Sequence, residues 1–140
     1  MQLKKIMSKN PECVSPSTPI GQVASVMKTR DIGMVLVSEN DHLVGTVTDR
    51  DIVIRGIAEG RDPRIAMTGD IMTSKAEYCF EDQDVTEAAH LMEEKQIRRL
   101  AILNRDKKLV GVISVGDLAS RTNDEEMTGE VIRFVVRPAA

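Results

Sequence analysis

The chain contains the same pattern twice, and this duplication constrains its fold more than any other feature. Residues 43–52 recur as residues 109–118, sixty-six positions later; both stretches open with Leu-Val-Gly and carry Asp next to last. Apolar residues of the preceding stretch, 20–27, recur sixty-five positions later in 85–92. The one-residue difference between these offsets lies between the blocks, where loops tolerate insertions. Two blocks in a fixed order indicate one structural unit that has been duplicated.

Each copy is predicted to contain a short strand, a helix, two further strands and a second helix. In the first copy Thr18 is expected to be the N-cap, with Pro19 at the first helical position. Apolar residues then follow at the i, i+3, i+4, i+7 spacing of an amphipathic helix that ends near Arg30. The other expected elements are strands at 33–37 and 43–48, a helix from near Asp51, a helix at 84–95, strands at 99–103 and 109–114, and a helix opening at Asp117.

The predicted fold is therefore α/β (α+β), with two β-α-β-β-α repeats packed sheet to sheet about a pseudo-twofold axis. The expected parts are a first repeat with its N-terminal segment at 1–60, a linker at 61–70, a second repeat at 71–122 and a C-terminal tail at 123–140. Such a pair creates two related clefts, which suit a small ligand. The tail matches nothing in the first half, and its apolar stretch 131–136 is expected to dock, with a partner subunit as one candidate surface.

Composition and charge argue against several classes of function. A net charge of −3 does not favour binding to nucleic acid or to an anionic membrane, and one tyrosine and two phenylalanines are too few for a base-stacking platform. No apolar run reaches the roughly eighteen residues of a membrane span, and no secretory signal is visible. Cys13 and Cys79 lack metal-ligand spacing and are too few for a disulfide scaffold. We therefore expect a cytoplasmic protein.

The repeated element that can carry chemistry reads Gly-x-x-Thr/Ser-x-x-Asp, at Gly45–Asp51 and Gly111–Asp117. Its hydroxyl, on Thr48 or Ser114, ends a strand, and its carboxylate lies in the first turn of a helix. One interpretation is a capping box, in which both side chains satisfy free amides at the helix start. The other is a nucleotide site, in which the carboxylate accepts hydrogen bonds from ribose hydroxyls and unpaired amides at the helix start bind phosphate. Both interpretations stay open, because a cap would be duplicated with its repeat.

The duplicated layout resembles a pair of cystathionine-β-synthase (CBS) domains, the Bateman module, over residues from about 6 to 122. The stretches 43–54 and 92–100 are similar to stand-alone bacterial CBS-pair proteins, including those of the hypoxic response protein type. Two ordered copies make this resemblance specific, whereas one copy of the motif would be a weak signal. The resemblance implies a homodimer that binds adenosyl ligands such as AMP, ADP, ATP, NAD or S-adenosylmethionine as regulatory ligands, with no required cofactor.

The resemblance also implies roles for individual residues. Asp51 and Asp117 would hold ribose hydroxyls, while Thr48 and Ser114 would contact phosphate or ribose. Residues near the base would be Thr46 and Val112, which flank it, and Val14 and Cys79, which help to wall the adenine pockets.

Arg98 and Arg99 would reach phosphate, as basic residues at this place often do in the family. The first repeat has Gly33 and Met34 at the equivalent positions, so the two sites would be unequal. The alternative is that both arginines simply end a solvated helix-to-strand turn.

Three classes of function follow. The leading hypothesis is a non-enzymatic sensor of adenine nucleotide, in which binding shifts the packing of the halves and a partner protein detects the shift. The second is a structural or interaction module that dimerises without ligand and whose turns are only caps. The third is an enzyme acting on nucleotides; it ranks last because no nucleophile–base arrangement, carboxylate dyad or metal motif stands out.

Overall fold

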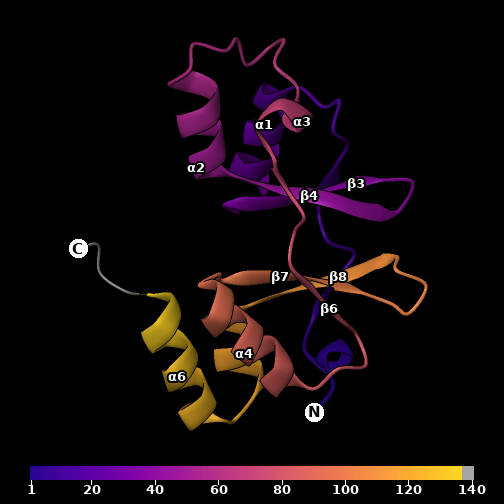
Figure 1. Cartoon of the computed structure of the whole chain (residues 1–140), viewed down its shortest axis with the longest axis vertical. Coiled ribbons are helices and arrows are strands. Elements are labelled where there is room, and N and C mark those ends of the chain that lie inside the picture. The colour runs from indigo at the N-terminus through magenta and orange to yellow at the C-terminus, as the bar shows by residue number, and fades with distance from the viewer. Residues whose placement is uncertain (137–140) are drawn as a thin grey trace. The chain divides into compact units, whose positions relative to one another are not determined.

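The structure, a computed structural model, describes residues 1–136 and forms two compact units. We call Glu12–Ala76 the first-repeat unit, and Met1–Pro11 together with the chain from Glu77 onward the second-repeat unit. Each unit is mixed α/β with a four-stranded sheet, which confirms the predicted fold class (Figure 1). The packing of the repeats about a pseudo-twofold axis stays a prediction, as do the domain boundaries read from the repeat.

The sheet of the first-repeat unit has the strand order β2-β3-β4-β5, and its helices lie on one face of that sheet (Figure 1). The short β2 (Cys13–Val14) is parallel to β3 (Met34–Glu39). Antiparallel pairing then joins β3 to β4 (His42–Thr48) and β4 to β5 (Thr73–Ser74). The helices are α1 (Ile20–Arg30), α2 (Asp49–Asp51), the π-helix η2 (Ile52–Ile57) that continues α2 directly, and α3 (Thr68–Ile71).

The second-repeat unit has the equivalent sheet, in the order β1-β8-β7-β6. β6 (Tyr78–Phe80) is parallel to β7 (Arg99–Leu103), and antiparallel pairing joins β7 to β8 (Leu109–Ser114) and β8 to β1 (Ser8–Lys9). The helices are the 3₁₀-helix η1 (Leu3–Lys5), α4 (Val85–Lys95), α5 (Val115–Arg121) and α6 (Glu125–Val135).

Each sheet takes its edge strand from outside its own repeat. β5 begins the second copy of the sequence pattern and completes the first sheet, whereas β1 begins the first copy and completes the second sheet. Close approach of these edge strands explains the glycine of the motif. A Cβ atom on Gly45 would lie 2.6 Å from the carbonyl oxygen of Thr73, and one on Gly111 would lie 2.9 Å from the carbonyl oxygen of Ser8.

The turns of the two repeats are also equivalent, although their residues differ. Left-handed backbone conformations occur at three pairs of positions separated by the two sequence offsets: Asn10 and Lys75, Asp31 and Gln96, and Asp41 and Lys107. Asp31 and Gln96 end α1 and α4 as left-handed C-caps. The duplication therefore extends to backbone geometry that side-chain identity alone does not reveal.

Each unit has its own apolar core between helices and sheet. In the first-repeat unit, side chains of α1 meet alternate residues of β3 and β4, as the helical and strand periods require. They are Ile20, Val23, Met27, Val35, Val37 and Val47. In the second-repeat unit, Leu3 and Ile6 from the N-terminal segment join the core. Burying one such side chain contributes about 1.5–3 kcal/mol, so Leu3 and Ile6 help to stabilise the second-repeat unit.

Two expectations about the ends of elements need correction or completion. α1 begins at Ile20, and its N-cap is Pro19, without a side-chain cap bond. Thr18 lies one residue too early to be the N-cap; its carbonyl accepts hydrogen bonds from the amide and hydroxyl of Thr68 instead. The apolar part of the tail docks within its own chain, where α6 lies beside α4 (Figure 1). α6 also packs on α5, and its Met127, Val131 and Val135 are buried in the core of this unit. Residues 137–140 of the predicted tail lie outside the described residues.

Candidate functional site at the two strand-to-helix turns

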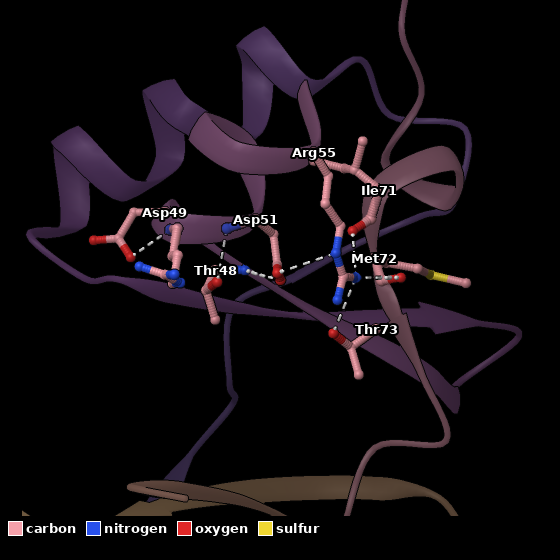
Figure 2. Close-up of polar contacts among 8 residues, drawn as sticks. Thr48, Asp49, Asp51, Arg55, Ile71, Met72 and Thr73 are labelled. Carbon is pink, nitrogen blue, oxygen red and sulfur yellow. Dashed lines mark hydrogen bonds and ion pairs between the residues drawn. The ribbon is translucent and has the colours of Figure 1, made fainter. Parts of the chain in front are cut away.

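The motif of the first repeat forms a complete capping box where β4 turns into α2 (Figure 2). The Asp51 amide donates to Thr48 Oγ1 at 3.0 Å, and the Thr48 amide donates to Asp51 Oδ2 at 3.0 Å. Two further amides are also used, because Asp49 donates to the Gly33 carbonyl and Arg50 donates to Asp49 Oδ1. The first three amides of this helix are therefore satisfied by the protein. The expectation of unpaired amides for phosphate is wrong at this turn.

The second repeat forms the same box where β8 turns into α5. The Ser114 amide donates to Asp117 Oδ2 at 2.8 Å, and the Asp117 amide donates to Ser114 Oγ at 3.1 Å. The Ser114 hydroxyl also donates to Asp117 Oδ2, at 3.0 Å. Within residues 1–136 the Thr48 hydroxyl has no such acceptor, so its proton is available to a ligand. The two turns share their backbone geometry but differ in this donor.

The capping bonds occupy one oxygen of each carboxylate and leave the other, Oδ1, for a different role. The side chains of Asp51 and Asp117 are 14% and 17% exposed, so each charge is mostly removed from water and requires partners. An arginine four residues later supplies one: Arg55 Nε lies 3.9 Å from Asp51 Oδ1, and Arg121 Nε lies 3.5 Å from Asp117 Oδ1. Each Oδ1 can still accept further hydrogen bonds, because a carboxylate oxygen has two lone pairs.

Arg55 and Arg121 are contacts that the motif alone did not reveal. Their spacing could have identified them, since they are sixty-six residues apart, as are the two motif aspartates. The repeated element is therefore longer by four residues and reads Gly-x-x-Thr/Ser-x-x-Asp-x-x-x-Arg.

Arg98 and Arg99 lie beside the second turn. Arg99 is the cross-strand partner of Ser114, so the two side chains stand on the same face of the sheet. The Arg98 carbonyl accepts the Val115 amide at 3.0 Å, which anchors the chain just before β7. Both arginine side chains are exposed, and neither makes a hydrogen bond or ion pair with the described part of the chain. Two unpaired cations therefore stand next to this turn.

Strand alternation places Thr46 and Val112 with the motif hydroxyls. Thr46 and Thr48 flank the core residue Val47 along β4, so both point away from the core. Val112 and Ser114 flank Ile113 in the same way along β8. The structure thus brings together, on one sheet face in each unit, the residues predicted to flank the base and to contact ribose or phosphate.

Val14 and Cys79 lie on the other side of their sheets. Val14 pairs with Val37 and packs against the core of its unit, and Cys79 pairs with Ile102 within a core. Burial, with smaller effects of Glu87 and Glu77, raises the pKa of the Cys79 thiol to about 11. A role for these two residues as walls of adenine pockets stays a prediction, and their core-facing positions do not support it.

Two further features are absent from residues 1–136. No group of three or more His, Cys, Asp or Glu side chains in this part of the chain gathers in a way that could hold a metal ion. None of its helices is both long enough and apolar enough to cross a membrane.

Comparison with known proteins places these features in a wider context. The family model described as CBS domain matches the chain twice, at residues 3–56 and 69–123. Hypoxic response protein 1 of Mycobacterium tuberculosis is 31% identical over 138 residues, which cover 98% of this chain and 95% of that protein. The crystal structure of hypoxic response protein I with two coordinated zinc ions is 32% identical, with a TM-score of 0.81 over 87% of this chain and 99% of that chain.

A more distant structure shares the fold. A CBS domain protein from Pyrobaculum aerophilum complexed with AMP has a TM-score of 0.78 at 22% identity, over 94% of this chain and 98% of that chain.

Proposed function

The chain belongs to the CBS domain family, and we propose that it is a regulatory module that binds an adenosyl ligand at its strand-to-helix turns without catalysis. In this proposal Asp51 and Asp117 accept hydrogen bonds from ribose hydroxyls. Binding alters the packing of the protein, and a partner protein detects the change. A homodimer and a cytoplasmic location belong to the same proposal.

The state of the two carboxylates is the observation that carries this proposal. In both turns Oδ2 is held by a backbone amide, which fixes the orientation of the group, while Oδ1 retains accepting capacity. A fixed carboxylate at the end of a strand is suited to a ribose, as the acidic residue of dinucleotide-binding folds shows. The cap and the ligand site are therefore compatible uses of one side chain.

The amides at the start of α2 are already bonded, so a phosphate at the first turn would depend on side chains. At the second turn we likewise assign phosphate to side chains. Arg98 and Arg99 are the candidates, since both are exposed and unpaired within the described residues. Each can form charge-assisted hydrogen bonds, which are about twice as strong as neutral ones. The first repeat offers Gly33 and Met34 in their place, so more highly charged ligands should prefer the second turn. The AMP in the Pyrobaculum aerophilum protein makes AMP the first ligand to test.

The alternative is a ligand-free structural or interaction module, and one observation favours it. Both motifs form complete capping boxes from protein atoms alone. A helix cap contributes about 0.5–2 kcal/mol, which could by itself justify the Thr/Ser-x-x-Asp pattern.

The decisive experiment is mass analysis of small molecules released from the purified protein, followed by thermal melts with AMP, ADP, ATP, NAD and S-adenosylmethionine. A ligand present at one hundred times its Kd stabilises the folded state by about 2.7 kcal/mol. For a chain of this size we expect the midpoint to rise by roughly 5–15 °C with the correct ligand. No released adenosyl compound and no shift with any of the five would favour the structural module.

A further inference from the structure

We propose that Arg55 and Arg121 are positioning residues that hold the ribose-binding carboxylates and tie each of them to the edge strand supplied by the other repeat. The inference rests on the proposed function of Asp51 and Asp117. It adds a direct physical connection between the ligand site and the places where the chain passes from one unit to the other.

The connection is clearest in the second-repeat unit. Arg121 Nε lies 3.5 Å from Asp117 Oδ1, and Nη1 of the same guanidinium donates to the Ile6 carbonyl at 2.9 Å. Ile6 lies two residues before β1, the edge strand of this sheet. The Arg121 guanidinium therefore bridges Asp117 Oδ1, the oxygen proposed to accept ribose hydroxyls, and the segment that leads into β1.

The first-repeat unit contains the equivalent bridge. Figure 2 shows the Arg55 guanidinium between Asp51 on one side and the segment Ile71–Thr73 on the other. Its Nε lies 3.9 Å from Asp51 Oδ1, and its Nη1 donates to the carbonyl of Ile71 at 3.2 Å and to that of Met72 at 3.4 Å. Ile71 lies two residues before β5, as Ile6 lies two residues before β1. An incidental surface pair would not be expected to recur with the same backbone acceptor.

The glycine of each motif allows the same segments to lie close to the neighbouring strand, because it has no Cβ atom. A Cβ atom on Gly111 would lie 2.6 Å from Met7 Sδ, and one on Gly45 would lie 2.9 Å from Met72 Sδ. Each repeat thus fixes the incoming segment at two points, with a glycine that allows close approach and an arginine that bonds a carbonyl. Of these two residues, only the arginine also contacts the motif carboxylate. It can therefore couple ligand binding at the carboxylate to the stability of the segment before the edge strand.

Ligand binding at the carboxylate and formation of the arginine bridge are expected to favour each other. A guanidinium is planar and always charged, so it can orient Oδ1 and bond a carbonyl at the same time. If the arginine favours the carboxylate geometry that a ribose requires, bound ribose must favour the arginine bridge by the same factor. Ligand binding then stabilises the pairing of β1 and β5 with their neighbouring strands. The chain passes to the other unit after Pro11 and after Ala76, within three residues of each of these strands.

The test compares the full-length protein with Arg121→Gln, Asp117→Asn and the double variant. Amide hydrogen exchange at Ser8 and Lys9, measured without ligand, reports the hold on β1. Calorimetric titration with AMP reports the site. Arg105→Gln is the matched control, because Arg105 is an exposed arginine that pairs with Asp82 in the same unit, away from the motif. Exposed ion pairs are weak, so we expect about two- to fivefold effects in both measurements.

We expect Arg121→Gln and Asp117→Asn each to speed exchange at β1, with the double variant no faster than Arg121→Gln alone, and Arg105→Gln to match the parent. Arg121→Gln should weaken AMP binding, and that loss should vanish in the Asp117→Asn background. Unchanged exchange, or effects that simply add, would overturn the bridge. If the parent does not bind AMP, the AMP proposal fails, and exchange at Ser8 and Lys9 still decides whether the bridge exists.

Discussion

Replacing Gly45 with alanine is expected to destabilise the first-repeat unit, because the edge strand β5 lies too close to β4 to admit a Cβ atom. The added carbon would stand 2.6 Å from the Thr73 carbonyl oxygen and 2.9 Å from Met72 Sδ. The methionine side chain can move, but the carbonyl belongs to a backbone that is paired with β4 at Thr46 and Gly45. Overpacking of this kind typically costs 1–3 kcal/mol, and the backbone contact places Gly45→Ala near the upper end, at about 2–3 kcal/mol.

Two other glycines calibrate this prediction. In Gly111→Ala the shortest contact is with the flexible Met7 Sδ, and the backbone oxygen of Ser8 is farther, at 2.9 Å, so we expect a loss of about 1–2 kcal/mol. In Gly129→Ala nothing lies within 4 Å of the new atom, and the site is inside α6, where alanine is favoured over glycine by up to about 1 kcal/mol. Urea unfolding followed by circular dichroism measures all three. A Gly45→Ala variant as stable as the parent would refute the close-approach argument.

The remaining predictions concern charge. The Thr86 amide, together with the N-terminal ammonium, lowers the pKa of Asp84, the N-cap of α4, from 3.8 to about 2. Asp84→Ala should therefore cost about 0.5–2 kcal/mol at pH 7, and its difference from the parent should shrink as pH falls from about 4 to 2; a constant difference in urea titrations across that range would contradict the assignment. Arg98→Ala or Arg99→Ala should weaken ATP or ADP binding more than adenosine binding in calorimetric titrations, with Lys108→Ala as a charge control. Equal losses for all three ligands would remove the phosphate role.

Much of the fold could be predicted because the repeat supplied each element twice. The helix at Val85–Lys95 and the strands at Arg99–Leu103 and Leu109–Ser114 occur where periodicity indicated them. The exchange of edge strands could not be predicted in this way. A two-residue strand such as β1 carries no periodic signal, and its pairing with β8 is set by contacts about one hundred residues apart in the sequence.

The candidate site was predictable to a similar extent. Thr48, Asp51, Ser114 and Asp117 meet as the motif required, because all their contacts are local. Arg55 was not identified, since its acceptors on Ile71 and Met72 belong to a distant segment whose position depends on the strand exchange. The resemblance implies a pocket role for Cys79, which stays a prediction; its register opposite Ile102 within a core is a feature that the sequence pattern does not reveal.

The most direct test of the central claim is calorimetric titration of the Asp51→Ala, Asp117→Ala double variant with AMP, beside thermal melts of the same samples. A hydrogen bond to a charged group contributes roughly 1.5–3 kcal/mol, so each lost carboxylate should weaken its site by about ten- to a hundredfold. Asp70→Ala is the matched control, since Asp70 accepts the Met67 amide in a cap at α3 and takes no part in the motif. We predict a double variant that is folded and binds AMP about ten- to a hundredfold more weakly at both sites. A double variant that binds AMP as the parent does, with only its melting temperature lowered, would show that the aspartates are caps and nothing more.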